Sequence, residues 1–140
     1  MTYVSHVRPR WSDMDVYGHV NHANMVTLLE EARIPVLFGD AVKAGLTELP
    51  KGVVVVKLGV HYRAPIVVTP ETSVRVEITL TEVKAASITL AYVVHTGPEE
   101  SDPVAVTAET VLAPYDTVKL RPRRLSAEET EFLKKVFADA

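Results

Sequence analysis

The stretch "SDMDVYGHVNHANMVTLLEEAR", residues 12–33, places a polar segment directly before the apolar pattern of a helix. Residues 12–24 alone hold two aspartates, two histidines and two asparagines. The residues that follow show the i, i+3, i+4 spacing of one buried helix face, which consists of Met25, Leu28, Leu29, Ala32 and Val36. The stretch therefore predicts a polar turn that leads into a half-buried helix.

The ends of this helix are also marked in the sequence. Asn21 or Asn24 can cap its start by accepting a hydrogen bond from a free backbone N–H. Pro35 lies inside the apolar pattern, so we expect the helix to kink there or to restart with Pro35 in a first turn. Gly39 or Gly45 would end it.

The rest of the chain reads as strands followed by a short helix. The predicted strands cover residues 3–11, 52–65, 72–83, 86–95 and 104–115, and those at 72–83 and 86–95 alternate cleanly between apolar and polar residues. The final helix covers residues 126–140, with Ser126 and Glu129 at the spacing of a capping box. We expect a single domain over residues 1–140, of the α+β class, with one antiparallel sheet and its helices on one face.

Composition limits the classes of function. Apolar residues make up 47% of the chain, but no apolar run approaches the roughly 18 residues of a membrane span. The N-terminal residues lack the order of a secretion signal, so we expect a cytoplasmic protein without a membrane partner. The absence of cysteine excludes a thiolate nucleophile and cysteine-ligated zinc.

The charge balance argues against non-specific binding to nucleic acid, because the net charge is −3. One basic cluster could still meet a phosphate group or could simply be solvated. It consists of Lys119, Arg121, Arg123 and Arg124.

Two metal-site interpretations of the opening stretch fit poorly. In a calcium loop that starts at Asp13, the fifth and twelfth positions would be ligands, but they hold Tyr17 and Asn24. A transition-metal site would use His19 and His22, yet these residues straddle a turn and a helix start, with no further histidine nearby in sequence. We therefore expect no metal.

A third interpretation uses the helix itself. The first N–H groups of a helix lack intrahelical partners and carry partial positive charge, so the N–H of His22 could stabilise an oxyanion formed during acyl transfer. Asp15 could curl back beside it because Gly18 allows a tight turn. Alternatively, Asp13 and Asp15 only form the turn and His22 is only a first-turn residue. The residues alone leave both interpretations open.

The motif resembles a known family. The pattern D-x-D-x-x-G-x-V, then H-A-N and E-x-A-R, resembles the signature of hotdog-fold acyl-CoA thioesterases of the 4-hydroxybenzoyl-CoA thioesterase type. Asp15, Gly18, Val20, His22, Ala23, Asn24, Glu30, Ala32 and Arg33 occupy its positions. The resemblance continues in "VHYRAP" (60–65), "KAAS" (84–87) and "KLRPRRL" (119–125), and so covers almost the whole chain.

This resemblance implies a hotdog fold, in which an antiparallel five-stranded sheet wraps around a long central helix. It also implies a homodimer or homotetramer with active sites at the dimer interface and no cofactor. Asp15 would act as general base or nucleophile, and the helix N-terminus at His22 would polarise the thioester carbonyl. Further substrate contacts are expected from Gly18, Val20, Asn21, Tyr62, Lys84 and Ser87.

Several residues have expected supporting roles. Lys84 and Ser87 match a turn near the CoA pyrophosphate in relatives, although a solvated turn is an alternative. Glu30 and Arg33 match scaffold residues, and His19 would orient the loop. Met25 replaces the usual aromatic residue, so the acyl pocket need not keep the family's shape.

We therefore expect an acyl-CoA thioesterase that releases a free carboxylic acid and CoA. The alternative is a noncatalytic protein on the same fold that binds acyl-CoA or an acyl-carrier protein.

Overall fold

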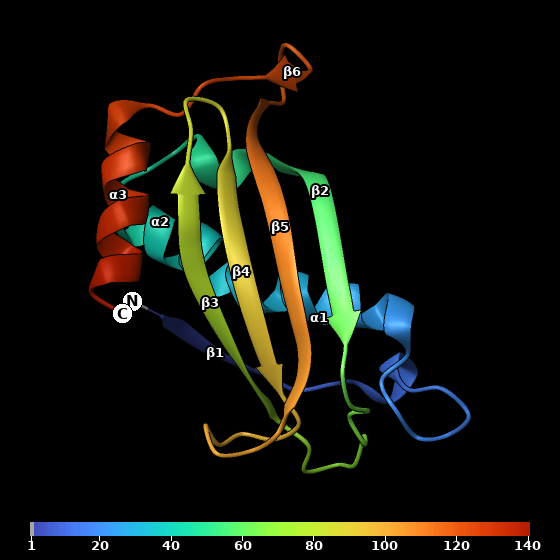
Figure 1. Ribbon diagram of the computed structural model, residues 1–140. Coiled ribbons are helices and arrows are strands. Elements are labelled where there is room, and N and C mark those ends of the chain that lie inside the picture. The colour runs from blue at the N-terminus through green and yellow to red at the C-terminus, as the bar shows by residue number, and fades with distance from the viewer. Residues whose placement is uncertain (1) are drawn as a thin grey trace.

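A curved antiparallel sheet wraps around one long helix in the computed structural model, which describes residues 2–140 (Figure 1). Its main strands follow the order β1-β3-β4-β5-β2, and all neighbouring pairs are antiparallel. Their bounds are β1 Tyr3–Val7, β2 Val53–Tyr62, β3 Val74–Val83, β4 Ile88–His95 and β5 Val104–Asp116.

The sheet has six strands rather than the expected five, because a two-residue strand β6 (Arg121–Pro122) pairs with the end of β5. The turn before β6 is held by the Asp116 carboxylate, which accepts hydrogen bonds from the N–H groups of Val118 (3.0 Å) and Lys119 (2.9 Å). These bonds hold the pKa of Asp116 below its usual value, Lys119 contributing most. A two-residue strand has too little periodicity to be read from sequence.

β1 is shorter than predicted. It ends at Val7, and residues Trp11–Asp13 form a short 3-10 turn instead of continuing the strand. Pro9 explains this ending because proline cannot donate to a strand ladder.

The central helix begins at His22 and runs through α1 (His22–Ile34), a π-helical segment (Pro35–Asp40) and α2 (Ala41–Lys43). The side chain of Asn21, not that of Asn24, caps it by accepting the N–H of Ala23 at 2.9 Å. At Pro35 the helix widens to π spacing and continues, and the side chains of Val36 and Leu37 in this segment are buried in the hydrophobic core. Gly45, with φ of +84°, follows its end.

The hydrophobic core lies between this helix and the inner face of the sheet. The predicted helix face is confirmed, since all five of its apolar residues are buried. The predicted alternation of β3 and β4 is also confirmed by burial of Val74, Val76, Ile78, Ile88, Leu90, Tyr92 and Val94. Arg33 is buried beneath the sheet, where its Nη1 donates to the Tyr92 hydroxyl at 3.4 Å, and this contact fits the expected scaffold role.

Helix α3 (Ala127–Ala138) packs near β3 and starts with the predicted capping box of Ser126 and Glu129. Glu129 is buried and accepts two 2.7 Å hydrogen bonds from Arg123. Burial alone would raise the pKa of Glu129, but the bonds from Arg123 and Ser126 outweigh it and hold that pKa below its usual value. The Arg123 guanidinium is therefore paired with Glu129 within the fold, whereas a phosphate-binding cluster would need it free to meet a phosphate group.

Candidate active site

Residues 13–21 form a tight hairpin that leads into the central helix. The N–H of Asn21 donates to the carbonyl of Asp13 at 2.8 Å, and the N–H of Asp15 donates to the carbonyl of His19 at 2.8 Å. Gly18 turns the chain with φ of +76°, a conformation that favours glycine. The expectation that Gly18 permits a tight turn is confirmed.

The two aspartates of this hairpin have different surroundings. The Asp13 side chain is 1% exposed, and its carboxylate accepts three hydrogen bonds from the Arg10 backbone and guanidinium at 2.7, 3.2 and 2.9 Å. The hydrogen bonds from the Arg10 side chain hold the pKa of Asp13 below its usual value. Asp13 is thus committed to the structure of the turn.

Asp15 is only partly buried and uses one oxygen in the turn. Its Oδ1 accepts hydrogen bonds from the N–H of Tyr17 at 2.9 Å and of His19 at 3.3 Å. Oδ2 accepts none of the hydrogen bonds formed within residues 2–140. The carboxylate is therefore oriented by one oxygen while the other can meet a ligand or water.

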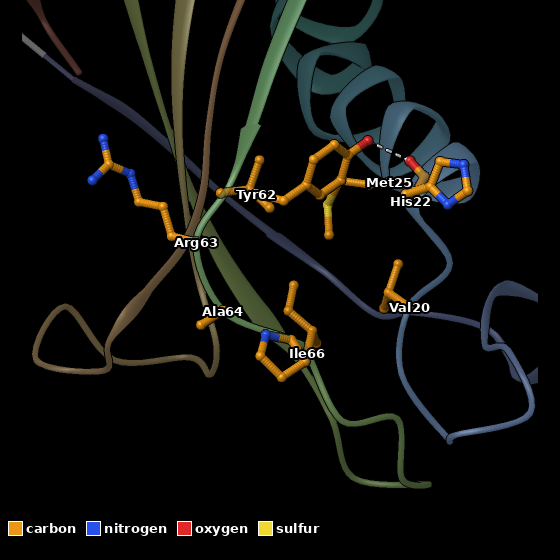
Figure 2. A pocket seen from close by; sticks show the side chains of 9 residues that line it. Val20, His22, Met25, Tyr62, Arg63, Ala64 and Ile66 are labelled. Atoms are coloured by element: carbon orange, nitrogen blue, oxygen red, sulfur yellow. Dashed lines mark hydrogen bonds between the residues drawn. The ribbon is translucent and has the colours of Figure 1, made fainter.

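A cavity of about 280 Å³ opens at the N-terminus of α1, between that helix and the end of β2 (Figure 2). His22 is the first residue of the helix, so its N–H has no intrahelical acceptor. The Tyr62 hydroxyl donates to the His22 carbonyl at 2.6 Å and ties the end of β2 to the first turn of the helix. The cavity is lined by Val20, His22, Met25, Tyr62, Arg63, Ala64, Pro65, Ile66 and Val106.

This arrangement can polarise a carbonyl group. A helix N-terminus carries about half a positive charge, and its free N–H groups can donate to the oxygen of a carbonyl group. The position of His22 at both the helix start and the cavity wall would let a ligand carbonyl meet that N–H while its apolar part enters the pocket.

The structure brings only part of the predicted site together within one chain. Val20, His22 and Tyr62 line the cavity, whereas Asn21 caps the helix. Gly18 lies at the hairpin tip and bonds through its carbonyl to the Val68 N–H at 2.9 Å. Asp15 belongs to the same hairpin but does not line the cavity.

Lys84 and Ser87 lie at the opposite end of the sheet. In the sheet, Ile88 at the start of β4 pairs with Leu112 of β5, and Leu112 pairs with Val55 near the start of β2. The cavity lies at the other end of β2, at Tyr62. At about 3.3 Å per strand residue, these two ends of β2 are roughly 20 Å apart. Lys84 instead pairs with Glu82 at 3.0 Å, and its N–H donates to the Ser87 carbonyl at 2.8 Å.

Some lining residues were not predicted from sequence. Ile66 and Val106 come from segments far from residue 22 and gave no signal other than apolar character. Arg63, Ala64 and Pro65 lie inside the "VHYRAP" motif, which pointed to the region without identifying their contacts.

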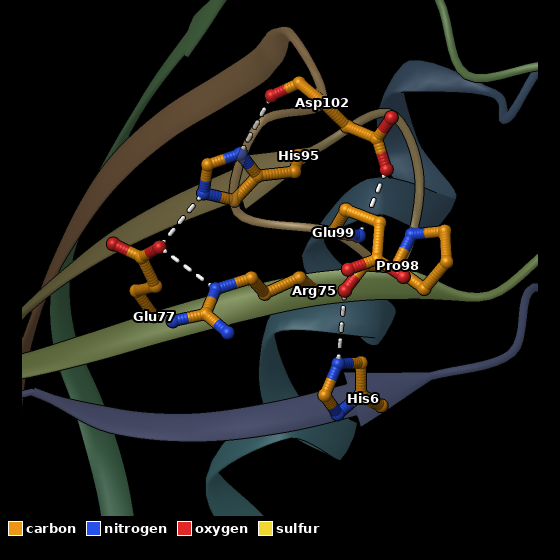
Figure 3. A network of polar contacts seen from close by, with 7 residues as sticks. All are labelled: His6, Arg75, Glu77, His95, Pro98, Glu99 and Asp102. Atoms are coloured by element: carbon orange, nitrogen blue, oxygen red, sulfur yellow. Dashed lines mark hydrogen bonds and ion pairs between the residues drawn. The ribbon is translucent and has the colours of Figure 1, made fainter.

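A second polar network lies on the outer face of the sheet (Figure 3). The two ring nitrogens of His95 contact the Asp102 carbonyl and the Glu77 carboxylate, each at 2.9 Å, and Arg75 donates to the same carboxylate at 2.9 Å. Burial would raise the pKa of Glu77, but the bonds from Arg75 and His95 outweigh it and lower the pKa. These contacts attach the loop after β4 to the sheet and use the polar groups internally.

Two further observations concern the described chain. Within residues 2–140, no three histidine, aspartate or glutamate side chains gather as a metal ion would require. No helix in that part of the chain is both long and apolar enough to cross a bilayer.

The comparisons with known proteins identify relatives of this fold. Residues 9–136 match the model of the thioesterase-like superfamily, and no curated protein matches the chain significantly. A 1,4-dihydroxy-2-naphthoyl-CoA thioesterase from Synechocystis is 15% identical with a TM-score of 0.76, over 97% of this chain and 98% of its own. A DHNA-CoA thioesterase from Staphylococcus aureus is 21% identical with a TM-score of 0.74, over 98% and 91%.

A third solved structure contains a ligand. It is a thioesterase complexed with coenzyme A and Zn from Thermus thermophilus, 22% identical with a TM-score of 0.74, over 96% of this chain and 94% of its own. At these identities the likeness concerns the fold, and the predicted hotdog fold is confirmed.

Proposed function

Because the chain belongs to the thioesterase-like superfamily, we propose that it hydrolyses acyl-CoA thioesters to a free carboxylic acid and coenzyme A. The observation that carries this proposal is the free start of the central helix at His22, which opens onto a cavity lined by both polar and apolar side chains. The coenzyme A bound by the Thermus thermophilus relative supports the choice of thioester. A cytoplasmic location is part of the proposal and rests on sequence alone.

In the proposed reaction, the thioester carbonyl oxygen accepts a hydrogen bond from the N–H of His22. Oδ2 of Asp15 takes a proton from a water molecule, whose oxygen attacks the carbonyl carbon. The negative charge that forms on the carbonyl oxygen is stabilised at the helix N-terminus until the carbon–sulfur bond breaks. The CoA thiolate leaves and takes up a proton. In the alternative route, Asp15 attacks directly and water then hydrolyses the mixed anhydride.

A second copy of the chain is part of the proposed site. Within residues 2–140, β2 pairs only with β5, so its other edge faces solvent. This edge carries exposed apolar residues, namely Val54, Val55, Val56 and Leu58. An exposed apolar edge strand is a template for pairing with another chain. We therefore propose a homodimer at least, formed edge to edge through β2.

The pairing direction explains how the separated residues could meet. If two β2 strands pair antiparallel, the Val53 end of one lies beside the Tyr62 end of the other. The turn with Lys84 and Ser87, which lies at the Val53 end, then approaches the cavity of the partner. Antiparallel pairing thereby removes the roughly 20 Å separation along the strand direction, and the remaining offset across the sheet is three strand spacings from β4 to the partner's β2, about 14 Å.

The deciding experiment follows the release of free thiol from a panel of acyl-CoA thioesters with a thiol reagent. Catalysed release supports the proposal. Tight binding of the same compounds without thiol release would favour the noncatalytic binding protein instead. Elemental analysis of the purified protein tests the metal-site interpretation of His19 and His22 separately.

A further inference from the structure

His95 is a buried histidine whose two ring nitrogens both face hydrogen-bond acceptors. Its side chain is 6% exposed, Nδ1 lies 2.9 Å from the Asp102 carbonyl oxygen, and Nε2 lies 2.9 Å from the Glu77 carboxylate (Figure 3). A carbonyl oxygen only accepts hydrogen bonds, and so does an ionised carboxylate. Burial raises the pKa of Glu77, but the bonds from Arg75 and His95 outweigh it, so the lowered pKa leaves this carboxylate ionised near neutral pH.

Only the protonated ring satisfies both of these contacts. An imidazolium donates from both nitrogens, whereas a neutral imidazole has one N–H and one bare nitrogen. In the neutral ring, the bare nitrogen would direct its lone pair at an oxygen 2.9 Å away. The single N–H would go to Glu77, because bonds to a charged acceptor are roughly twice as strong as neutral ones. Loss of the proton therefore breaks the contact with the Asp102 carbonyl.

The contact with Asp102 attaches the loop of residues 96–103, which joins β4 to β5. The base of this loop is also held by backbone bonds that do not titrate. The Thr96 N–H donates to the Pro103 carbonyl at 2.8 Å, and the Arg75 N–H donates to the Gly97 carbonyl at 3.0 Å. His95 thus contributes the bond that can respond to pH, at the end of the loop next to β5.

This end of the loop lies beside the proposed active site. Ala105 follows the loop by two residues, and its carbonyl accepts the N–H groups of Arg63 at 2.8 Å and of Ala64 at 3.1 Å. Both of these residues line the cavity at the helix start. A change in the loop would therefore occur two residues from the strand position that holds the cavity wall.

The charged and titratable groups around His95 have opposing effects on its proton. Arg75 is a second cation on the Glu77 carboxylate and disfavours the imidazolium, whereas Glu77 favours it. The Asp102 carboxylate is used inside the loop, where it accepts the Glu99 N–H at 2.8 Å. The groups of this network are Arg75 and Glu77 from β3, His6 from β1, and Glu99 and Asp102 from the loop (Figure 3), while β5 places Val104 opposite His95.

His6 makes a related contact that does not require a charged ring. One of its ring nitrogens, Nε2, lies 3.2 Å from the Pro98 carbonyl oxygen. A neutral imidazole can donate this one bond. His6 therefore provides a natural comparison within the same loop.

We propose that His95 is a pH-dependent switch: its imidazolium form attaches the 96–103 loop to β3, and its neutral form releases that loop beside the cavity. Histidine ordinarily changes charge near pH 6.5, so the transition is to be sought between pH 5 and 8. The switch is independent of the proposed thioesterase activity.

The test follows the ring and the loop in the same protein across this pH range. Nuclear magnetic resonance of the ring nitrogens distinguishes the imidazolium from the neutral ring, and hydrogen exchange of the Thr96 and Asp102 amides reports the loop. We expect both ring nitrogens to be protonated at pH 5 and only Nε2 at pH 8. Protection of the loop amides, expressed relative to an unfolded chain at the same pH, should fall about 10-fold or more in the same transition.

Three variants identify the group that controls the transition. His95→Gln removes the titrating ring and should make loop protection constant between pH 5 and 8. Arg75→Gln removes the competing cation and should move the transition to higher pH by about one unit, even if His95→Gln folds poorly. His6→Gln is the matched control, because it removes the other histidine contact with this loop and should leave the transition at the same pH.

Several outcomes would overturn the switch. A His95 ring that titrates in the parent protein without a change in loop protection would do so on its own. A transition that persists in His95→Gln, or that stays at the same pH in Arg75→Gln, would also overturn it. Because thiol release is not among the measurements, failure of the proposed thioesterase activity would leave this test unaffected.

Discussion

Substitution of Asp15 by asparagine separates catalysis from folding at this hairpin. The amide oxygen of asparagine can still accept the hydrogen bonds that Tyr17 and His19 donate to Oδ1, so the turn should persist. The change at Oδ2 replaces an atom that can take a proton with an NH₂ group that cannot. We therefore expect stability within about 0.5 kcal/mol of the parent.

The expected catalytic effect is large. Loss of a positioned general base lowers kcat by about 100-fold or more, equivalent to about 2.7 kcal/mol of barrier. Binding of a nonhydrolysable acyl-CoA analogue should survive, because the N–H of His22 still meets the carbonyl. The assay is thiol release for kcat, calorimetric titration for the analogue and thermal unfolding for stability.

Asp13→Asn provides the opposite pattern two residues away. Its buried carboxylate accepts three hydrogen bonds from Arg10, and bonds to charged groups contribute about 1.5–3 kcal/mol. We expect its Tm to fall by roughly 5–10 °C while kcat below that temperature changes much less than in Asp15→Asn. Equal losses of kcat at the two positions, or near-normal turnover in a stable Asp15→Asn enzyme, would remove Asp15 from the mechanism.

Three other predictions concern association, CoA binding and pH. Val56→Lys places a charge on the exposed β2 strand and should shift the protein toward the monomer, which light scattering would detect at a mass of 15.4 kDa. If the parent protein is already a folded monomer at micromolar concentration, the proposed dimer is wrong. Lys84→Ala should raise KM more than it lowers kcat and weaken the salt dependence of KM, whereas an unchanged KM would mean a solvated turn. Because the pKa of Glu129 is lowered in the fold, the carboxylate stabilises the protein above its unfolded pKa of about 4.3, and this contribution is lost as pH falls through the folded value. The difference in unfolding free energy between the parent and Glu129→Gln should therefore shrink below about pH 4, and a constant difference would refute it.

Several features of the fold were predictable because they depend on neighbours in the chain. The alternation in β3 and β4 predicted which side chains face the core, since successive strand residues point to opposite sides of a sheet. The Asn21 cap was one of two predicted candidates, and the capping box of Ser126 and Glu129 followed from residue types at fixed spacing. The hotdog fold itself followed from the resemblance of the whole motif set.

Pro35 marks the limit of such local reasoning. Sequence predicted a kink or a restart, and the structure instead widens the helix to π spacing over Pro35–Asp40. The local preference against proline inside a helix was outweighed by burial of Val36 and Leu37. The outcome depends on burial in the hydrophobic core, which the local sequence does not encode.

Sequence alone thus predicted the five main strands, the central and final helices, their order along the chain and a polar turn before the central helix. The resemblance singled out Asp15, but only the tertiary structure showed how the two aspartates differ physically. The Asp13 side chain is buried against Arg10, whereas Asp15 keeps one carboxylate oxygen free of hydrogen bonds within residues 2–140. The tertiary structure alone assembled a cavity from Val20, Met25, Ile66 and Val106. The physical reason is that periodicity and capping act over a few residues, whereas burial and ionic pairing depend on which distant segments the curled sheet brings together.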